Sequence, residues 1–416
     1  MADATNEPPE DRIPSEPAEA NPDQPRRWSF LRKRRWWCYI SAVPLLLACL
    51  GAFFLWAVFA WPRVNWFTYF FIVRPPLIWF GALIPGLIIG AVGVRRRWLI
   101  AGCALWLVAF AGPEEILPWF RLSSAGARQD FADAHFAYSA FMEDADRVPD
   151  ELDLPIRIVT WNVAAGRFAG DDAVSRLAEH EPDLALLQEY RWGSKSRIAE
   201  PLTESKAFRG YHHHEAPQAL FSRWPVKVLP SPYLSPYNCR IYRVQVTPKH
   251  ALILINVHLS RPVLKTQLLK GWTPESLRRE IAHTQSELDA LERTVDEYQD
   301  DGTVIIAGDF NLPPTYPPLR ALRERHLDCF AERGFGWGKT APTLWRGRRI
   351  LPMMRVDMIW APSGSQVYYC RACCNSASDH AMVVAEVSVR IRLQADSVQT
   401  DKKTADTPLD ADGGDI

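Results

Sequence analysis

A series of short β-rich runs between Pro155 and about Arg392 constrains the fold of this 416-residue chain more than any other feature. A helical stretch at 274–298 interrupts the series, with Leu277, Ile281 and Leu288 near one face. Strands that alternate with helices predict a domain of the α/β or α+β class over residues 155–392. The runs cover residues 156–161, 184–187, 241–246, 252–257, 304–307, 356–360 and 382–389.

Most of these runs end in, or lie next to, polar residues. The polar positions are Asn162, Gln188-Glu189, His258, Asp309 to Asn311, Asp357 and Ser378 to His380. Taken singly, Asp309 to Asn311 could be an Asx turn, Glu189 a solvated loop carboxylate and His258 a structural histidine. Polar groups just past strand ends commonly converge on one edge of a sheet. The ordered series therefore favours one shared site.

The residue types at these positions suit metal-assisted hydrolysis of a phosphoester. Carboxylate and amide oxygens without a thiolate favour a hard cation such as Mg²⁺, with Mn²⁺ as an alternative. Such a cation neutralises the phosphate and the charge that develops on its oxygens. An Asp would activate water, and a His held by a carboxylate would act on the phosphate or the leaving group.

The motifs themselves resemble those of the endonuclease/exonuclease/phosphatase superfamily. That group includes DNase I-like nucleases, exonuclease III-like repair enzymes, inositol polyphosphate 5-phosphatases and neutral sphingomyelinases. The resemblance implies an α/β fold, a four-layer α/β/β/α sandwich of two packed, mainly antiparallel sheets with outer helices. The motifs, in family order, are Trp161-Asn162-Val163, Leu187-Gln188-Glu189, Phe221 to Val226, Asn256 to Leu259, Gly308 to Asn311, Arg355-Val356-Asp357 and Ser378-Asp379-His380.

The resemblance also implies a role for each matching residue. Glu189 would be the main metal-binding carboxylate, with Asn162 beside the metal and Asp379 as a second carboxylate. Asp309 would position and deprotonate the attacking water. The other roles are a phosphate contact for Asn311, catalysis for His380, orientation of that histidine for Asp357, and contact with the phosphate or leaving group for His258.

One position departs from the pattern of the repair-type members of the superfamily. Those members carry a metal-binding Asp two residues after the first Asn, and this chain has Ala164 there. A second metal at that edge and a role in abasic-site repair both lose support.

The N-terminal region predicts a membrane anchor. Residues 1–35 are polar and then basic, and we expect a disordered cytoplasmic segment. Charge-free runs at about 36–61, 75–94 and 98–113 form the predicted transmembrane region 36–113. A signal peptide is the alternative for the first run, and a buried or re-entrant segment for the short third run. Residues 114–154 are expected to be a linker, with a short helix around 131–141 as its one candidate element, and 393–416 a disordered tail.

The distribution of Lys and Arg orients this anchor. Basic residues at 26–35 and at Arg95 to Arg97 hold those segments in the cytoplasm. Three spans would place the catalytic domain on the extracytoplasmic side of the cell (inner) membrane, and two would place it inside. We expect the first arrangement, with the lipid bilayer as a partner through the N-terminal helices. No protein partner is indicated.

The sequence is compatible with several substrates and with a domain that lacks activity. The formal net charge is zero, which gives no chain-wide basic excess for nucleic acid. Nucleic acid, a phospholipid headgroup or another small phosphoester all fit the site. A catalytically silent binding or sensing domain of the same fold is the main alternative to an enzyme. Cys370, Cys373 and Cys374 could pack in the core or form a disulfide.

Overall fold

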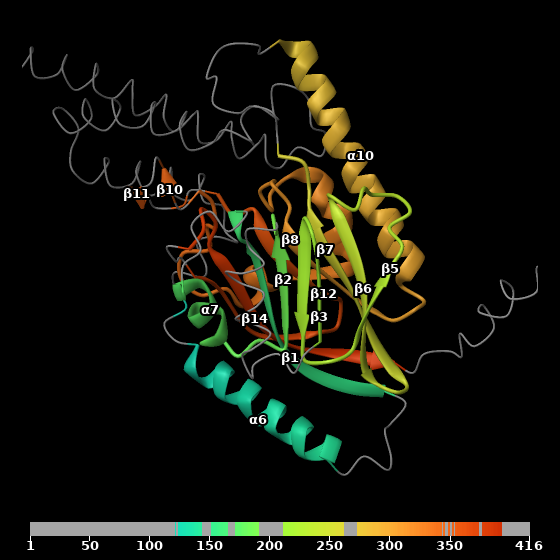
Figure 1. Ribbon diagram of the computed structural model, residues 1–416, viewed down its shortest axis with the longest axis vertical. Helices are drawn as coiled ribbons and strands as arrows, with labels where there is room; N and C mark the ends of the chain where they lie inside the picture. Colours follow the sequence, from blue (N-terminus) through green and yellow to red (C-terminus); the bar gives the residue numbers. More distant parts are fainter. Residues whose placement is uncertain are drawn as a thin grey trace, which may run out of the picture.

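Two six-stranded mixed sheets pack against each other and form the centre of the molecule (Figure 1). This computed structural model describes residues 121, 124–143, 151–164, 171–190, 211–261, 273–342, 344–345, 348–349, 352, 354–373 and 377–392. The predicted spans at 36–61, 75–94 and 98–113, and the predicted segments 1–35 and 393–416, lie outside these residues. No helix in the described part of the chain is long and apolar enough to cross a membrane.

The first sheet has the strand order β13-β14-β1-β2-β4-β3. Only β1 and β2 run parallel, and α7 (Asp171–Ala178) lies between them in the chain. A parallel pair needs such a crossover. The strands are β1 (Glu151–Asn162), β2 (Leu184–Gln188), β3 (Tyr211–Glu215), β4 (Gln218–Ser222), β13 (Gln366–Cys373) and β14 (Met382–Arg392).

The second sheet repeats this arrangement in the order β5-β6-β7-β8-β12-β9. Its one parallel pair is β7 and β8, and the long helix α10 (Pro274–Tyr298) connects them. The strands are β5 (Val226–Leu229), β6 (Cys239–Thr247), β7 (His250–His258), β8 (Thr303–Asp309), β9 (His326–Asp328) and β12 (Asp357–Pro362). Shorter elements are η3 (Pro317–Leu319), α11 (Arg320–Arg325), α12 (Cys329–Arg333) and the strand pair β10 (Leu344–Trp345) and β11 (Arg348–Arg349).

The main core lies between the sheets. Ile156 and Ile158 of β1 face Leu254 of β7 and Ile305 of β8 within one cluster of buried apolar side chains. Alternate residues of the same strands point to the outer faces, as the period of a strand requires. These central strands are buried on both faces, so their sequences read as nearly continuous apolar runs.

Helices cover the outer faces, as the four-layer fold requires. α10 packs Leu288, Leu291 and Val295 onto the second sheet, a spacing that places them on one helix face. Thr273 begins this helix with a capping box to Ser276. On the other side, Leu177 of α7 joins a cluster on the first sheet. The predicted helix at 274–298 and the two packed sheets are confirmed.

The segment 114–154, predicted to be a linker with a short helix around 131–141, contains a longer helix in its described part. A 19-residue helix, α6 (Ala125–Glu143), lies along the first sheet (Figure 1). Phe131 of this helix is 1% exposed. The first strand also begins at Glu151, which pairs with Arg392, rather than at 155. α6 covers polar side chains of the sheet, among them Arg157 and Asp183. Apolar residues stand on both faces of α6, with Phe131 and Tyr138 buried and Phe136 and Phe141 exposed, which explains the weak periodicity of its sequence.

The cysteines of the described residues are free thiols. Cys370 is buried in the core between the sheets, and Cys373 at the end of β13 is half-buried. Burial holds the pKa of Cys370 well above its usual value, so its thiol stays protonated and unreactive. Core packing is thus the role of Cys370, while Cys374 lies outside the described residues.

Candidate active site

The strand register brings polar residues together at one end of both sheets. His258, at the end of β7, pairs with Asp309, at the end of β8. Asp309 also pairs with Asp357, the first residue of β12. In the first sheet, Asn162 at the end of β1 pairs with Gln188 at the end of β2. These pairings explain why residues far apart in the chain share one edge.

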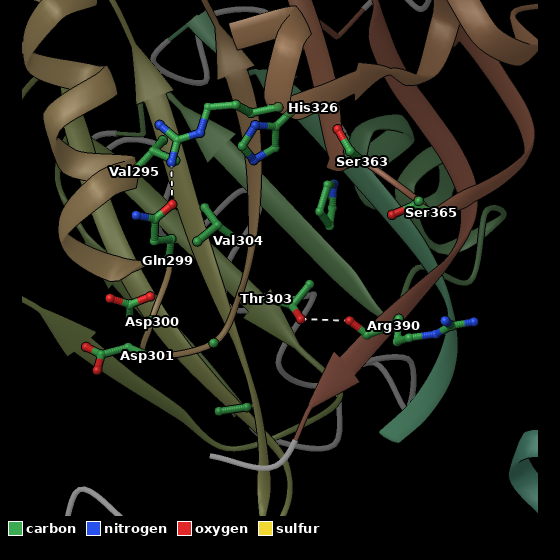
Figure 2. A pocket seen from close by; sticks show the side chains of 15 residues that line it. Val295, Gln299, Asp300, Asp301, Thr303, Val304, His326, Ser363, Ser365 and Arg390 are labelled. Atoms are coloured by element: carbon green, nitrogen blue, oxygen red, sulfur yellow. Dashed lines mark hydrogen bonds between the residues drawn. The ribbon is translucent and has the colours of Figure 1, made fainter. Parts of the chain in front are cut away.

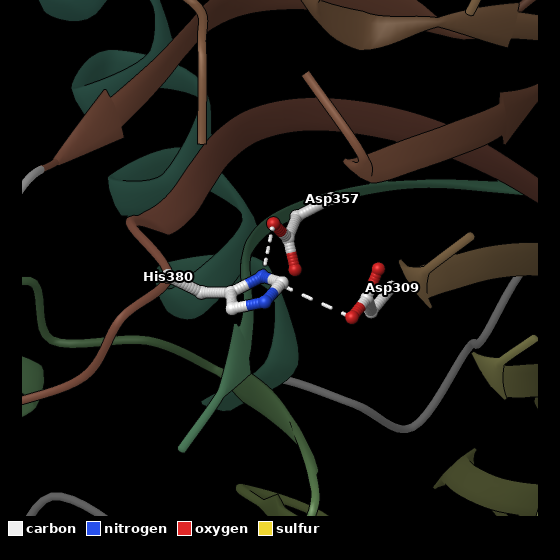
Figure 3. A group of neighbouring side chains, drawn as sticks. All are labelled: Asp309, Asp357 and His380. Atoms are coloured by element: carbon white, nitrogen blue, oxygen red, sulfur yellow. Dashed lines mark hydrogen bonds and ion pairs between the residues drawn. The ribbon is translucent and has the colours of Figure 1, made fainter. Parts of the chain in front are cut away.

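A buried group of Asp309, Asp357 and His380 forms the base of the site (Figure 3). Nδ1 of His380 lies 2.9 Å from Oδ2 of Asp357 and 3.8 Å from Oδ2 of Asp309. All three residues are at most 3% exposed. Because Nδ1 is engaged with the Asp357 carboxylate, Nε2 is the imidazole nitrogen left for chemistry.

The charge state of His380 follows from these neighbours. Burial alone would lower the pKa of His380, but the carboxylates of Asp357 and Asp309 outweigh it and raise the pKa to about 9. The half-buried Asp379 adds to this effect. At neutral pH the ring is an imidazolium that can donate a proton.

Asn162 links the two sheets at this point. Its Nδ2 donates to Oδ2 of Asp309 at 3.0 Å and to Oε1 of Glu189 at 3.2 Å. Its Oδ1 accepts from the backbone N–H of Ala164 at 2.9 Å, which fixes the orientation of the amide. Asn162 therefore places Glu189 beside Asp309.

The backbone is strained at this edge. Glu189, Asn311 and Ala164 have φ values of 49°, 54° and 49°, in the left-handed region that residues other than glycine rarely adopt. Each such residue costs about 1–3 kcal/mol, and such residues concentrate at functional sites. Gly308 is also required, because a Cβ there would lie 2.0 Å from the carbonyl oxygen of Val257.

His258 and Asn311 border the same space. Nε2 of His258 lies 3.7 Å from Oε1 of Glu189 and 3.9 Å from Oδ2 of Asp309. Asn311 is held by a backbone N–H bond to Oδ1 of Asp309 at 2.9 Å, and its Nδ2 donates to the carbonyl of Leu259 at 2.8 Å. Its Oδ1 is turned toward the guanidinium of Arg261.

The structure joins seven of the predicted residues by direct contacts and leaves one apart. Asn162, Glu189, His258, Asp309, Asn311, Asp357 and His380 form a continuous set of contacts. Asp379, the eighth, sits next to His380 and is half-buried. Its role at a metal stays a prediction.

Several residues to which the sequence analysis assigned no role support this set from below. Gln188 donates to Oδ1 of Asn256 at 2.8 Å and to Oγ1 of Thr160 at 2.9 Å, so an amide pair ties the sheets together under the site. Ser378 donates to the carbonyl of Asn162 at 2.6 Å and accepts from the backbone N–H of His380. Gln188, Asn256 and Ser378 all stand inside the recognised motifs, which was the available signal.

The donor set fits a hard divalent cation. The tightest group of possible ligand atoms, those of Asp309, Asp357 and His380, all lie within 4.8 Å of one another and could hold a metal. All three residues are buried, however, and a hydrogen bond already joins Nδ1 of His380 to Oδ2 of Asp357. The carboxylate of Glu189 is 20% exposed, and Mg²⁺ prefers oxygen ligands and keeps several waters. The Glu189 side of the site therefore suits Mg²⁺ better.

A polar cavity of about 650 Å³ lies at the opposite end of the second sheet (Figure 2). Thr303, which lines it, begins β8, whereas Asp309 ends that strand. The 7 residues of β8, at about 3.3 Å each, separate the two places by roughly 20 Å. Arg325 and Arg390 at the cavity pair with Asp296 and Asp153. The cavity is separate from the Asp309 site.

Comparison with known proteins gives one family match. The model of the Endonuclease/Exonuclease/phosphatase family matches residues 159–380. This stretch covers more than half of the chain and every motif described above. None of the curated proteins matches the chain.

Solved structures show similarity at low identity. A functionally unknown conserved protein from Enterococcus faecalis V583 is 15% identical, with 56% of this chain and 99% of that chain covered and a TM-score of 0.40. The endonuclease/exonuclease/phosphatase from Bacteroides vulgatus is 15% identical, with coverages of 57% and 99% and a TM-score of 0.40. D. rerio TDP2 complexed with a single-strand DNA product is 16% identical, with coverages of 56% and 99% and a TM-score of 0.42. At these values the structural matches carry no argument about activity.

Proposed function

The chain belongs to the endonuclease/exonuclease/phosphatase family, and from that premise we propose that it is a Mg²⁺-dependent phosphoester hydrolase held at a membrane by its N-terminal region. The observation that carries this proposal is the contact set of Asn162, Glu189, Asp309 and His380. This set brings together a proton acceptor, Asp309, a proton donor, His380, and the partly exposed carboxylate of Glu189.

The residues divide the chemistry among them as follows. Asp309 accepts a proton from the attacking water, and Asn162 keeps its carboxylate oriented. His380 turns Nε2 toward the phosphate, because Asp357 holds Nδ1. His258 and Asn311 contact the phosphate or the leaving group from the sides. A general acid or base placed in this way contributes typically about 10²–10⁴-fold to the rate.

Glu189, Asn162 and Asp379 are the residues we assign to the cation. A bound Mg²⁺ would supply positive charge that offsets the charge of the phosphate oxygens. Carboxylates surround this space, and an anionic phosphate would be repelled without a counter-charge. The charge of the site therefore supports the proposed metal requirement, and so does the family.

The membrane attachment rests on the sequence. The charge-free runs at 36–61, 75–94 and 98–113 and the flanking basic residues support an anchor with the catalytic domain on the extracytoplasmic side. A domain tethered in this way meets substrates at the bilayer surface. A phospholipid headgroup is thus favoured modestly over nucleic acid, and other small phosphoesters fit the same chemistry.

A substrate panel on the full-length chain in detergent tests the activity. It contains duplex DNA, RNA, phosphoinositides, sphingomyelin and bis(p-nitrophenyl) phosphate, each with Mg²⁺ and with EDTA, beside the variant Asp309→Asn. We expect Mg²⁺-dependent hydrolysis that the variant lacks. A wild type that binds one of these compounds but hydrolyses none would instead support the silent binding domain.

A fusion experiment tests the topology. A phosphatase that is active only after export, fused after residue 150, should be active in a bacterial host. An inactive fusion there beside an active fusion after residue 65 would support two spans and a cytoplasmic enzyme.

A further inference from the structure

Arg261 lies directly over the candidate site, although no motif predicted it. Its Nε donates to Oδ1 of Asn311 at 3.2 Å. Its Nη2 lies 3.5 Å from Nε2 of His380 and 3.8 Å from Oε1 of Glu189. The side chain is 44% exposed, so the guanidinium reaches both the site and the solvent.

We propose that Arg261 binds a non-bridging oxygen of the scissile phosphate, and that Glu287 positions it by holding the preceding residue. This inference rests on the proposed hydrolase function and adds to it a substrate-binding cation. It also assigns a task to a carboxylate of α10 that lies outside every motif.

The chemistry of the guanidinium matches this position. Arginine presents several N–H donors in a planar fork, which suits phosphate oxygens better than a point charge does. The Nη2 atom lies next to Nε2 of His380, and Asp357 holds the other nitrogen of that ring. The guanidinium and the catalytic imidazole therefore face the same point. An incoming phosphate would replace Asn311 and Glu189 as the acceptor for Arg261.

The backbone before Arg261 is clamped from α10. Glu287 is 6% exposed, and its two carboxylate oxygens accept from the backbone N–H of Ser260 at 3.3 and 3.2 Å. Its Oε1 also accepts from Oγ of Ser260 at 2.7 Å and from Nδ2 of Asn238. Asn238 in turn accepts the backbone N–H of His258 at 2.7 Å.

This clamp has a direct consequence for the site. A buried carboxylate is costly unless its oxygens are hydrogen-bonded, and the hydrogen bonds of Glu287 go to Ser260, which precedes Arg261, and to Asn238, whose backbone holds His258. His283 of α10 also lies 3.7 Å from Oε1 of Glu287. Glu287 thus fixes the direction in which the chain leaves β7. A displacement of about 1 Å at a reacting group can reduce a rate by about 10²-fold.

Steady-state kinetics of the full chain with Mg²⁺ and bis(p-nitrophenyl) phosphate test both assignments. Arg261→Gln should lower kcat/KM by about 10²–10³-fold, the usual loss for one oxyanion donor. Arg261→Lys should recover part of the lost kcat/KM, because Lys keeps the charge without the planar fork of donors.

Glu287→Ala should lower kcat/KM by about 10- to 100-fold. Glu287→Gln keeps an acceptor for Ser260 and should lower kcat/KM less. Arg279→Gln and Glu275→Gln are matched controls, since these exposed residues of α10 pair with each other.

A double variant separates positioning from a purely structural role. If Glu287 acts through Arg261, adding Glu287→Ala to Arg261→Gln should cost less than about 3-fold more, because groups that act as a unit are non-additive. A full multiplicative loss in the double variant, or an Arg261→Gln enzyme within about 3-fold of a working wild type, would overturn the inference while leaving the hydrolase intact. A wild type that hydrolyses no phosphoester overturns the proposed function, and this inference with it.

Discussion

Nδ1 of His380 lies 2.9 Å from Oδ2 of Asp357, and neither side chain is more than 4% exposed. This pair fixes the histidine in one orientation, with Nε2 directed toward Arg261 and the open side of the site. Asp309 stands on the neighbouring strand, directly opposite Asp357 in the register. β-Sheet pairing therefore places the two aspartates, and His380 stands in the bend just before β14.

The His380 pair predicts a pH dependence of stability. The folded-state pKa of His380 is about 9, above its ordinary value of 6.5. A raised pKa of this kind contributes stability that is fully present below about pH 6.5 and is lost as pH rises through about 9. Urea unfolding should show the wild type losing more stability between pH 7 and pH 9.5 than His380→Gln does. Equal losses in the two proteins would mean that the pair carries no extra proton.

The cation site predicts a distinct effect for Glu189. Glu189→Gln keeps the size of the side chain but removes the charge that we assign to Mg²⁺ binding. Activity should fall at low Mg²⁺ and recover in part as the Mg²⁺ concentration is raised, which a titration of initial rates measures. Glu215→Gln, at an exposed carboxylate on β3, should leave the Mg²⁺ dependence as it is. A Glu189→Gln enzyme with the Mg²⁺ dependence of the wild type would show that the cation binds elsewhere.

The packing of α6 predicts that this helix is part of the folded domain. Phe131 is 1% exposed, while Phe136 on the same helix is 76% exposed. Phe131→Ala should destabilise the protein by about 3–5 kcal/mol, the usual cost of removing a buried Phe, and Phe136→Ala should change it by less than about 0.5 kcal/mol. Chemical denaturation measures both. Equal small effects would mean that the region behaves as the linker that the sequence predicted.

The sequence predicted the central strands and missed the marginal ones for one physical reason. β7 and β8 are buried on both faces, so they read as apolar runs with clear ends. β3, with the sequence Tyr-His-His-His-Glu, forms an edge of the first sheet. An edge strand packs on fewer neighbours and needs fewer apolar residues. Such a strand has no periodic signal.

A similar limit applies to the site. Asp309 ends one apolar strand and Asp357 begins another, so their position at a sheet edge could be predicted. Arg261 follows the same kind of strand, but a single Arg after a His carries no pattern, and its contact with Asn311 spans 50 positions in the chain. Glu287 reads as one of many charges on α10, and only the fold shows that it faces Ser260.

The central claim is that Asp309, Asp357 and His380 act together on a phosphoester, and a mutant cycle measures it most directly. With the substrate that the panel identifies, kcat should fall by about 10²–10⁴-fold in Asp309→Asn and in His380→Ala, the range for a positioned acid or base. Asp357→Asn should also be impaired. The double variant Asp357→Asn/His380→Ala should be no more than about 3-fold worse than His380→Ala alone, because Asp357 acts through the imidazole. Near-full activity of His380→Ala, or losses that multiply in the double variant, would contradict this account of the site.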